Sequence, residues 1–316
     1  MNEIVFIINP ASAGGKTLRT WSGARRELLK GGLFFREHFT TRAEEAIEIT
    51  RRAVSEGDCI VIAVGGDGTL CEVIRGYLDQ NGRAINSQAA VGLLPSGTGS
   101  DFSRSLPAAA GMSLAAMLTQ KSTRMIDAAL ACYVNPQGRP ESRCYINLAS
   151  FGLGGDVVGF VNEWRSKFPN WVGGRTRFVI GALSALAAYR MKQVEVVLNG
   201  TRRITIQSNL IVVANGKFAG GGMMLAPDAQ IDDGLLDVTL TDDAGRLDVI
   251  KELPRIGRGG LLKNPKVSQA RAKEVKITSE KPMAIEVDGE LAGYTPATIK
   301  VLPGAVRFLC ALQEIP

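Results

Sequence analysis

Strand-like and helix-like segments alternate along the first third of the chain, and this alternation limits the possible folds more than any other feature. The expected strands cover residues 4–8, 33–39, 58–64 and 90–94, and the expected helices between them cover 18–30, 41–56 and 69–78. The run from 58 to 64 is apolar almost throughout, as is typical of a parallel strand with both faces covered. The alternation predicts an α/β domain on a parallel sheet.

The pattern changes after Asp127, where short β-rich runs become frequent. Among them are one run at 204–214 and two separate runs at 298–301 and 306–312. Turn pairs such as Asn199-Gly200 and Asp288-Gly289 separate many of the runs. Helical patterns near 156–167, 174–190 and 245–257 interrupt them. We expect an α/β domain at 1–127 and a β-sandwich-like domain at 128–316, whose last strand could return to the first domain.

Composition excludes several classes of protein. The chain has 316 residues, 45% of them hydrophobic and 22% charged, which is ordinary for a globular protein and excludes a disordered one. The longest apolar stretch, 178–189, is shorter than the roughly 20 residues that span a bilayer. Five cysteines without a C-x-x-C pair indicate reduced thiols. We therefore expect a cytoplasmic protein whose contact with membranes is peripheral.

The net charge of +6 suits a nucleotide, an anionic membrane or a nucleic acid, and by itself it does not distinguish them. The basic residues form no stripe interleaved with aromatic residues, so a nucleic-acid partner is not expected.

The first candidate site is the loop from Asn9 to Lys16, between a strand and a helix. Its small residues would let backbone N–H groups face an anion at a helix N-terminus, where Lys16 adds charge. Pro10 stands where a P-loop has its first glycine, and an ordinary turn explains the segment equally well. The residues predicted to bind nucleotide here are Asn9, Pro10, Ser12, Gly14, Gly15 and Lys16.

A second loop, with the sequence Gly-Gly-Asp-Gly-Thr, follows the buried strand and opens a helix. Ligands of α/β sheets bind at this edge, and the glycines allow a triphosphate to approach closely. Asp67 could hold Mg²⁺ or a hydroxyl. A glycine turn with an N-capping aspartate explains the aspartate and one glycine, but not all three glycines. The predicted nucleotide contacts are Gly65, Gly66, Asp67, Gly68 and Thr69.

This loop resembles the motif of diacylglycerol and sphingosine kinases, NAD kinases and, more loosely, phosphofructokinases. The segment from Leu94 to Arg104 resembles the P-x-G-T-x-N-D-F-x-R segment of the diacylglycerol kinase catalytic family, whereas the segments typical of NAD kinases are missing. The resemblance implies that Thr98 contacts nucleotide, Asp101 supports the metal and Arg104 faces the substrate. It also implies an active site in the cleft between the two domains.

Blocks further along the chain extend the resemblance as far as Glu290. By resemblance Thr40 contacts nucleotide and Asp127 belongs to the active cleft. In the block from Asn215 to Leu235, the family holds a structural Mg²⁺ with an aspartate and two carbonyls, which correspond to Asp233, Gln230 and Leu235. An Asp-Gly turn explains these residues almost as well.

The segment Asp288-Gly289-Glu290 is first of all a hairpin turn. The resemblance places Asp288 and Glu290 at the reaction centre, as base and metal-linked carboxylate. A hydroxyl attacking phosphorus needs a proton acceptor, and the one histidine, His38, lies in an expected strand. Whether Asp67, Asp288 or Glu290 takes the proton is left open. Mg²⁺ is expected near Asp67, Asp101 and Glu290.

Two residues depart from the family pattern, because Cys71 and Ser100 stand where the family usually has asparagine. An unusual nucleotide preference, slow turnover or a divergent substrate would be consistent with these changes. The expected function is an ATP- and Mg²⁺-dependent kinase of diacylglycerol or a related lipid alcohol. The alternatives are a kinase of a soluble substrate such as NAD, and a nucleotide or lipid sensor.

A lipid substrate would be met at a membrane surface. The segments 160–171 and 255–266 combine apolar and basic residues and could dock there, although a core-facing helix and a solvated loop explain them equally well. A homodimer is left open.

Overall fold

The computed structural model describes residues 3–57, 59–96, 100–106, 113–164, 180, 184–186, 190–208, 210–256 and 264–310. The chain forms two compact units. Unit 1 comprises Met1–Ala128, Ile231–Asp233 and Leu302–Pro316, and unit 2 comprises Ala129–Gln230 and Gly234–Val301. Two long strands, β5 (Thr123–Val134) and β17 (Glu290–Leu309), contribute residues to both units.

Unit 1 is built on a parallel sheet in the order β2-β1-β3-β4. Its strands are β1 (Glu3–Ile8), β2 (Arg36–Phe39), β3 (Cys59–Gly65) and β4 (Ala90–Pro95). The helices are α1 (Thr17–Lys30), α2 (Glu45–Glu56), α3 (Asp67–Tyr77) and α4 (Leu114–Gln120), with short 3₁₀ turns η1 (Ser12–Gly15) and η2 (Phe102–Arg104). The end of β17 pairs in parallel with β4.

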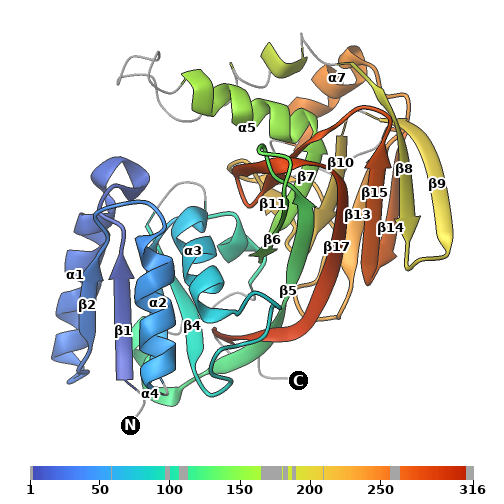
Figure 1. Cartoon of the computed structure of the whole chain (residues 1–316). Helices are drawn as coiled ribbons and strands as arrows, with labels where there is room; N and C mark the ends of the chain where they lie inside the picture. Colours follow the sequence, from blue (N-terminus) through green and yellow to red (C-terminus); the bar gives the residue numbers. More distant parts are fainter. Residues whose placement is uncertain are drawn as a thin grey trace, which may run out of the picture. The chain divides into compact units, whose positions relative to one another are not determined.

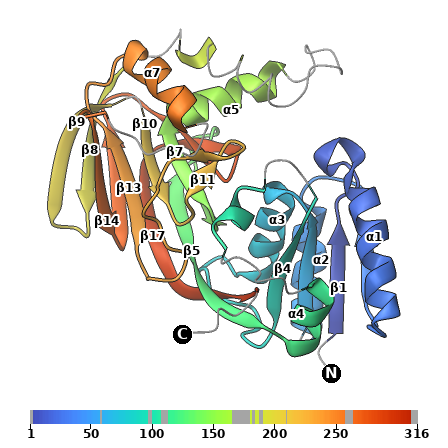
Figure 2. The ribbon, with the colours of Figure 1, turned by 180° about the vertical axis from the view of Figure 1, so that it is seen from behind.

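Helices cover both faces of this sheet (Figures 1 and 2). On one face, Trp21 of α1 and Leu118 of α4 pack against Phe6 and Ile62 of the central strands. On the other face, α2 and α3 lie together, and Gly76 lets them approach closely, because a Cβ there would lie 2.5 Å from the carbonyl oxygen of Ile47. The expected α/β domain with a parallel sheet is confirmed.

Unit 2 is rich in antiparallel strands. Its strands are β6 (Pro140–Tyr145), β7 (Leu148–Gly152), β8 (Lys192–Leu198), β9 (Arg202–Ser208), β10 (Leu210–Ala214), β11 (Phe218–Ala219), β12 (Met223–Met224), β13 (Leu236–Thr241), β14 (Val267–Ala272), β15 (Glu274–Ser279) and β16 (Ala284–Val287). Helices α5 (Leu153–Trp164) and α7 (Arg246–Ile256) accompany them.

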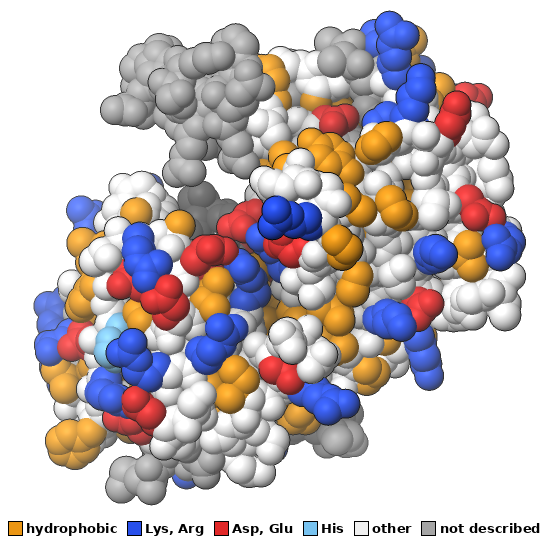
Figure 3. Space-filling view, in the orientation of Figure 1, with side chains coloured by type: hydrophobic (Ala, Val, Ile, Leu, Met, Phe, Trp, Pro, Cys, Tyr) orange, Lys and Arg blue, Asp and Glu red, His pale blue; other side chains and the backbone are white. Residues whose placement is uncertain are grey.

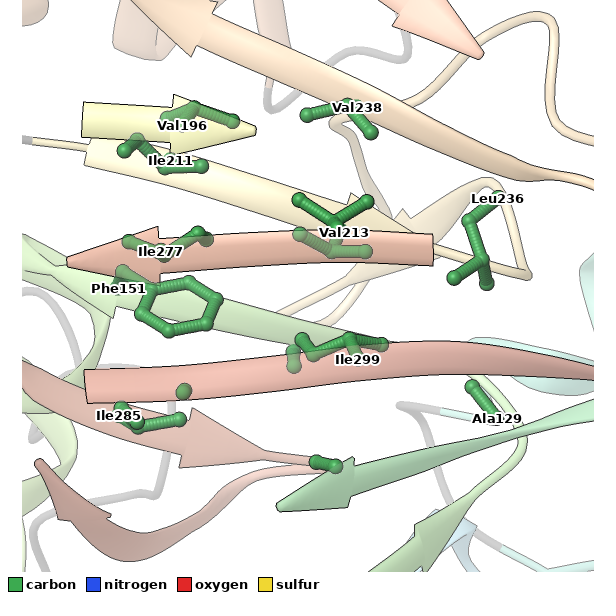
Figure 4. Packing of buried hydrophobic residues seen from close by; sticks show 14 of the residues in the cluster. Ala129, Phe151, Val196, Ile211, Val213, Leu236, Val238, Ile277, Ile285 and Ile299 are labelled. Carbon is green, nitrogen blue, oxygen red and sulfur yellow. The ribbon is translucent and has the colours of Figure 1, made fainter. Parts of the chain in front are cut away.

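One strand connects the two groups of strands in unit 2. β17 pairs with β16 near its start and with β15 in its middle. In the first group, hydrogen-bonded neighbours follow one another in the order β16, β7, β10, β13 and β14. In the second group, β15 pairs with β8, and β8 pairs with β9. Figure 4 shows Phe151, Ile285 and Ile299 among the side chains of the common core.

The structure differs from the expected elements in two places. The expected strand 204–214 is two strands, because β9 pairs with β8 while β10 pairs with β7 and β13. The expected run 298–301 and residues 306–309 of the next expected run are parts of one strand, β17, which continues through Pro303-Gly304. Between the two runs, the Gly304 amide donates to Asp127 Oδ1 at 2.7 Å. Most of the expected helix 174–190 lies outside the described residues.

Candidate functional site

Asn9 connects the loop after β1 to the start of α3. Its side-chain amide donates to Thr69 Oγ1 at 3.2 Å, and its own backbone amide donates to the Val64 carbonyl at 3.0 Å. Its Oδ1 atom accepts the Ala11 amide at 3.1 Å, which fixes the direction of the loop. The first two glycine-rich loops therefore converge at the carboxyl ends of β1 and β3.

Thr17 connects the same loop to the segment after β4. Its hydroxyl lies 2.7 Å from the hydroxyl of Ser96 and donates to the Ser12 carbonyl at 3.0 Å. The backbone amide of Ser96 donates to the Gly65 carbonyl at 3.0 Å. Neither Thr17 nor Ser96 was predicted to be a site residue. The hydroxyl residue directly after a loop lysine could have indicated Thr17.

Asp67, the first residue of α3, holds the third loop, which is the part of the segment after β4 that carries Asp101 and Phe102. One of its carboxylate oxygens accepts the amide of Asp101 at 2.9 Å and the other accepts the amide of Phe102 at 3.0 Å. Burial raises the pKa of Asp67, and the two amides oppose this effect. Asp101 is itself buried. The predicted residues Asp67 and Asp101 therefore lie together, and the first of them orders the loop that carries the second.

The backbone around these contacts leaves room for a ligand. Ala13, Gly14 and Gly15 have φ angles of 54°, 64° and 88°, which gives the first loop a left-handed turn. A Cβ at Gly14 or Gly68 would meet no heavy atom within 4 Å, so both face open space. At Gly65, in contrast, a Cβ would lie 2.3 Å from Thr69 Oγ1. Left-handed turns of small residues commonly present amides to anions.

Several other predicted residues of unit 1 have defined surroundings. Lys16 and Arg104 are exposed. Thr40 is buried, and its amide donates to the Ile8 carbonyl at 2.9 Å, close to the start of the first loop. Asp127 is 2% exposed and accepts the Gly304 amide, so it fixes the end of β17 in unit 1. The predicted contact through Thr98 lies outside the described residues.

The two residues that depart from the family pattern are both buried. Cys71 lies within α3 and is 5% exposed. Ser100 is 7% exposed, and its hydroxyl has no hydrogen-bond partner among the described residues.

In unit 2, Asp288 and Glu290 have different environments. Asp288 accepts three backbone amides, those of Ile146, Asn147 and Leu148, at 3.0–3.1 Å. Glu290 is half exposed, and its carboxylate lies 2.6 Å from Arg143 Nη1. Asp288 thus anchors the turn between β16 and β17, whereas Glu290 stays accessible. Arg143 was not predicted, because the two partners are 147 positions apart in sequence.

The described residues contain no ready-made metal centre. No group of three or more histidine, cysteine, aspartate or glutamate side chains is placed to hold an ion among them. Of the three residues predicted to hold a structural Mg²⁺, Asp233 belongs to unit 1, whereas Gln230 and Leu235 belong to unit 2. Mg²⁺ in nucleotide sites is usually held by one or two carboxylates together with phosphate oxygens, so the few carboxylates near the loops are compatible with it.

Unit 2 also contains a cavity of about 570 Å³ beside α5. Phe160 of α5 and Leu291 and Tyr294 of β17 provide apolar walls. The charged groups are Asp156, Arg190 and Lys192; burial raises the pKa of Asp156, and the charge of Lys192 opposes this. These polar residues were not predicted from the sequence.

Comparison with known proteins places this architecture in a family. Residues 3–131 match the model of the diacylglycerol kinase catalytic domain, and residues 148–310 match the YegS C-terminal NAD kinase beta sandwich-like domain. The chain belongs to the diacylglycerol kinase family, in the form that carries a YegS-type C-terminal domain. The family resemblance and the expected β-rich second domain are both confirmed.

Individual relatives agree with this assignment. A diacylglycerol kinase of Mycobacterium tuberculosis is 28% identical over 312 residues, which is 98% of this chain and 95% of that protein. A Pseudomonas aeruginosa protein named "Probable lipid kinase YegS-like" is 26% identical over 97% of this chain and 93% of its own length. A crystal structure of a diacylglycerol kinase from Bacillus anthracis, 19% identical, has a TM-score of 0.70 and covers 98% of this chain and 97% of that one, which shows a common fold.

Proposed function

We propose that this protein is a Mg²⁺- and ATP-dependent kinase that phosphorylates the hydroxyl group of diacylglycerol or a related lipid alcohol. Membership of the family supports a phosphotransferase. The observation that carries the proposal is the convergence of three loops in unit 1, joined by Asn9, Thr17 and Asp67. Such convergence suits one polyphosphate better than three independent turns.

The loops at 9–16 and 65–69 would bind the nucleotide phosphates. The α3 N-terminus favours negative charge, and the exposed Lys16 supplies a cation beside it. The open space at Gly14 and Gly68 allows phosphate oxygens to approach the backbone. Asp101, on the segment after β4, is the carboxylate that we propose for Mg²⁺, which when bound would neutralise charge on the transferring phosphoryl group.

Glu290 is the better candidate for the proton acceptor. The carboxylate of Asp288 is already engaged with three amides, and both oxygens of Asp67 hold the third loop. Glu290 is half exposed and forms an ion pair with Arg143. A general base must reach the hydroxyl that it deprotonates, which favours the accessible carboxylate.

The cavity beside α5 is the proposed acceptor site. Its apolar walls suit an acyl chain, and its charged residues suit the polar headgroup of a lipid alcohol. Asp156 could accept a hydrogen bond from a headgroup hydroxyl.

We further propose that α7 contacts the membrane. Of the segments predicted to dock, 165–171 and 257–263 lie outside the described residues. The described helix α7 exposes Leu247 and Ile250, at 71% and 44%, beside the exposed Arg246 and Lys251. Figure 3 shows Lys and Arg side chains gathered where α7 lies. Apolar residues among cations suit an anionic lipid surface. Among the described residues, no helix is long and apolar enough to cross a bilayer.

Transfer of label from γ-labelled ATP tests the proposal. The purified protein would be incubated with Mg²⁺ and mixed micelles of diacylglycerol, monoacylglycerol or a sphingoid alcohol, with NAD as the soluble acceptor. We expect label in one lipid, its loss in Glu290→Gln, and its retention in Glu195→Gln, which changes an exposed carboxylate on β8. Label in NAD alone would support the soluble-substrate alternative. Binding of ATP by folded protein without transfer to any acceptor would contradict a kinase.

A further inference from the structure

Glu286 is a buried carboxylate in β16, two residues before Asp288. The residue is only 7% exposed. Both of its carboxylate oxygens accept hydrogen bonds. Oε1 accepts the backbone amide of Gly289, and Oε2 accepts the hydroxyl of Ser150 at 2.5 Å. The residue therefore connects the turn before Glu290 to the neighbouring strand β7.

The surrounding backbone fixes this connection. Glu286 and Ser150 are directly paired across the antiparallel strands β16 and β7. The first turn of α5 lies on the pair, because a Cβ at Gly154 would come within 2.0 Å of the Ser150 hydroxyl. At Gly155 a Cβ would lie 2.8 Å from Ala284 of β16. α5 therefore packs closely on Ser150 and on β16, which limits the freedom of the Ser150–Glu286 pair to reorient.

A carboxylate is a costly choice for this position. Burial of a charge is unfavourable, and an apolar residue of similar size commonly stabilises a core at least as well. Sheet packing alone therefore does not explain Glu286. What the carboxylate adds is an acceptor for Gly289, the amide between Asp288 and Glu290, in a turn whose two residues have φ angles of 46° and 89°.

We propose that Glu286 is a positioning residue, which orients the Asp288-Gly289-Glu290 turn through the Gly289 amide while Ser150 holds Glu286 in place. The inference rests on the proposed role of Glu290 as the proton acceptor. Asp288 anchors one side of the turn and the buried Glu286 the other, so two carboxylates that accept backbone amides set the direction of the Glu290 side chain. Loss of this alignment should impair turnover more than substrate binding.

Few ionisable groups face Glu286. Burial raises its pKa to about 7, and the charge of Asp288 in the same turn adds to the rise, while the hydrogen bonds from Ser150 and Gly289 oppose it. Burial raises the pKa of Tyr145 of β6, and the charges of Asp288 and Glu286 add to that rise. From α5 the closest residue is Gly154, which has no side chain, and the ionisable residue in that first turn is Asp156.

Two variants at this position separate positioning from packing. Glu286→Leu fills similar space but cannot accept the Gly289 amide, and Glu286→Gln retains an acceptor oxygen. We expect Glu286→Leu to fold with a Tm no lower than wild type, because it removes a buried charge. Its kcat should fall about tenfold or more, with KM for ATP within about twofold of wild type, whereas Glu286→Gln should keep kcat within about threefold. Glu195→Gln is the matched control.

Hydrogen exchange of a peptide covering residues 286–294 supplies a test that needs no activity. We expect exchange in this peptide to be about tenfold faster or more in Glu286→Leu, and to be close to wild type in Glu286→Gln. If wild type labels no acceptor, the proposed function fails while the exchange experiment still tests the position of the turn. Wild-type exchange and wild-type kcat in Glu286→Leu would overturn the inference. Should that variant fail to fold, unchanged exchange in Ser150→Ala would overturn it instead.

Discussion

The pH dependence of stability offers a direct measurement of the buried Glu286 carboxyl. Its pKa is raised from 4.5 to about 7 because burial penalises the charged form. The native state therefore binds this proton more tightly than the unfolded state. The stabilisation by the neutral carboxyl is fully present below about pH 4.5 and is lost as the pH rises to about 7.

The size of the effect follows from the same shift. The difference between 4.5 and about 7 corresponds to roughly 3 kcal/mol, at about 1.4 kcal/mol for each pKa unit. Glu286→Gln has no ionisable group at this position, so it should lose this contribution to the pH dependence. We expect the free energy of unfolding of wild type, relative to Glu286→Gln, to fall by about 3 kcal/mol between pH 4.5 and pH 7.5 and to stay constant above.

Urea unfolding followed by circular dichroism at several pH values would measure this difference. Subtraction of one protein from the other cancels the titration of groups common to both. Glu290→Gln is the control for loss of a carboxylate outside the core, because that side chain is half exposed. If wild type and Glu286→Gln have parallel curves between pH 4.5 and 7.5, Glu286 is not a buried acid with a raised pKa, and the reasoning is wrong.

Three further changes test other parts of the structure. Asp67→Asn removes one of the two acceptors for the third loop, and should lower stability by about 1–2 kcal/mol in thermal denaturation and reduce label transfer about 100-fold. Gly154→Ala places a methyl group 2.0 Å from Ser150 Oγ; it should cost about 1–3 kcal/mol in urea unfolding, and an unchanged midpoint would contradict the close packing of α5. Leu247→Glu should weaken sedimentation with anionic vesicles by about tenfold and leave Tm within about 1 °C, whereas Leu29→Glu, which changes an exposed leucine of α1, should not affect vesicle binding.

Local patterns were sufficient for much of the fold. The apolar run that became β3 and the glycine-rich loops after β1 and β3 could be identified because each is encoded by neighbouring residues. The same holds for the hairpin at Asp288-Gly289, where both residues have positive φ as the turn requires. In contrast, the runs on either side of Pro303-Gly304 were expected to be separate, yet β17 continues through this pair, where Asp127, 177 positions away, accepts the glycine amide.

Site residues held by distant partners could not be found from the sequence. Arg143 and Glu290 are 147 positions apart, and Ser150 and Glu286 are 136 positions apart. Each pair depends on which strands become neighbours and in which register, and no local signal specifies this. Asp288 shows the converse: its motif was recognised, but its three amide partners on the segment before β7 were not predictable.

These contacts suggest that the carboxylates of the motifs have different roles. An oxygen that accepts backbone amides keeps its neighbours in place only while those hydrogen bonds persist, so a proton or a metal ion would compete with the loop that it orders. Asp67 and Asp288 are in this position, each with its oxygens directed at the amides of a neighbouring loop. Glu290 can change its partner without disturbing the backbone, because it accepts a hydrogen bond from the side chain of Arg143 and not from a backbone amide of a described residue. A motif with two acidic residues therefore need not provide two chemical groups: the first can build the turn that presents the second.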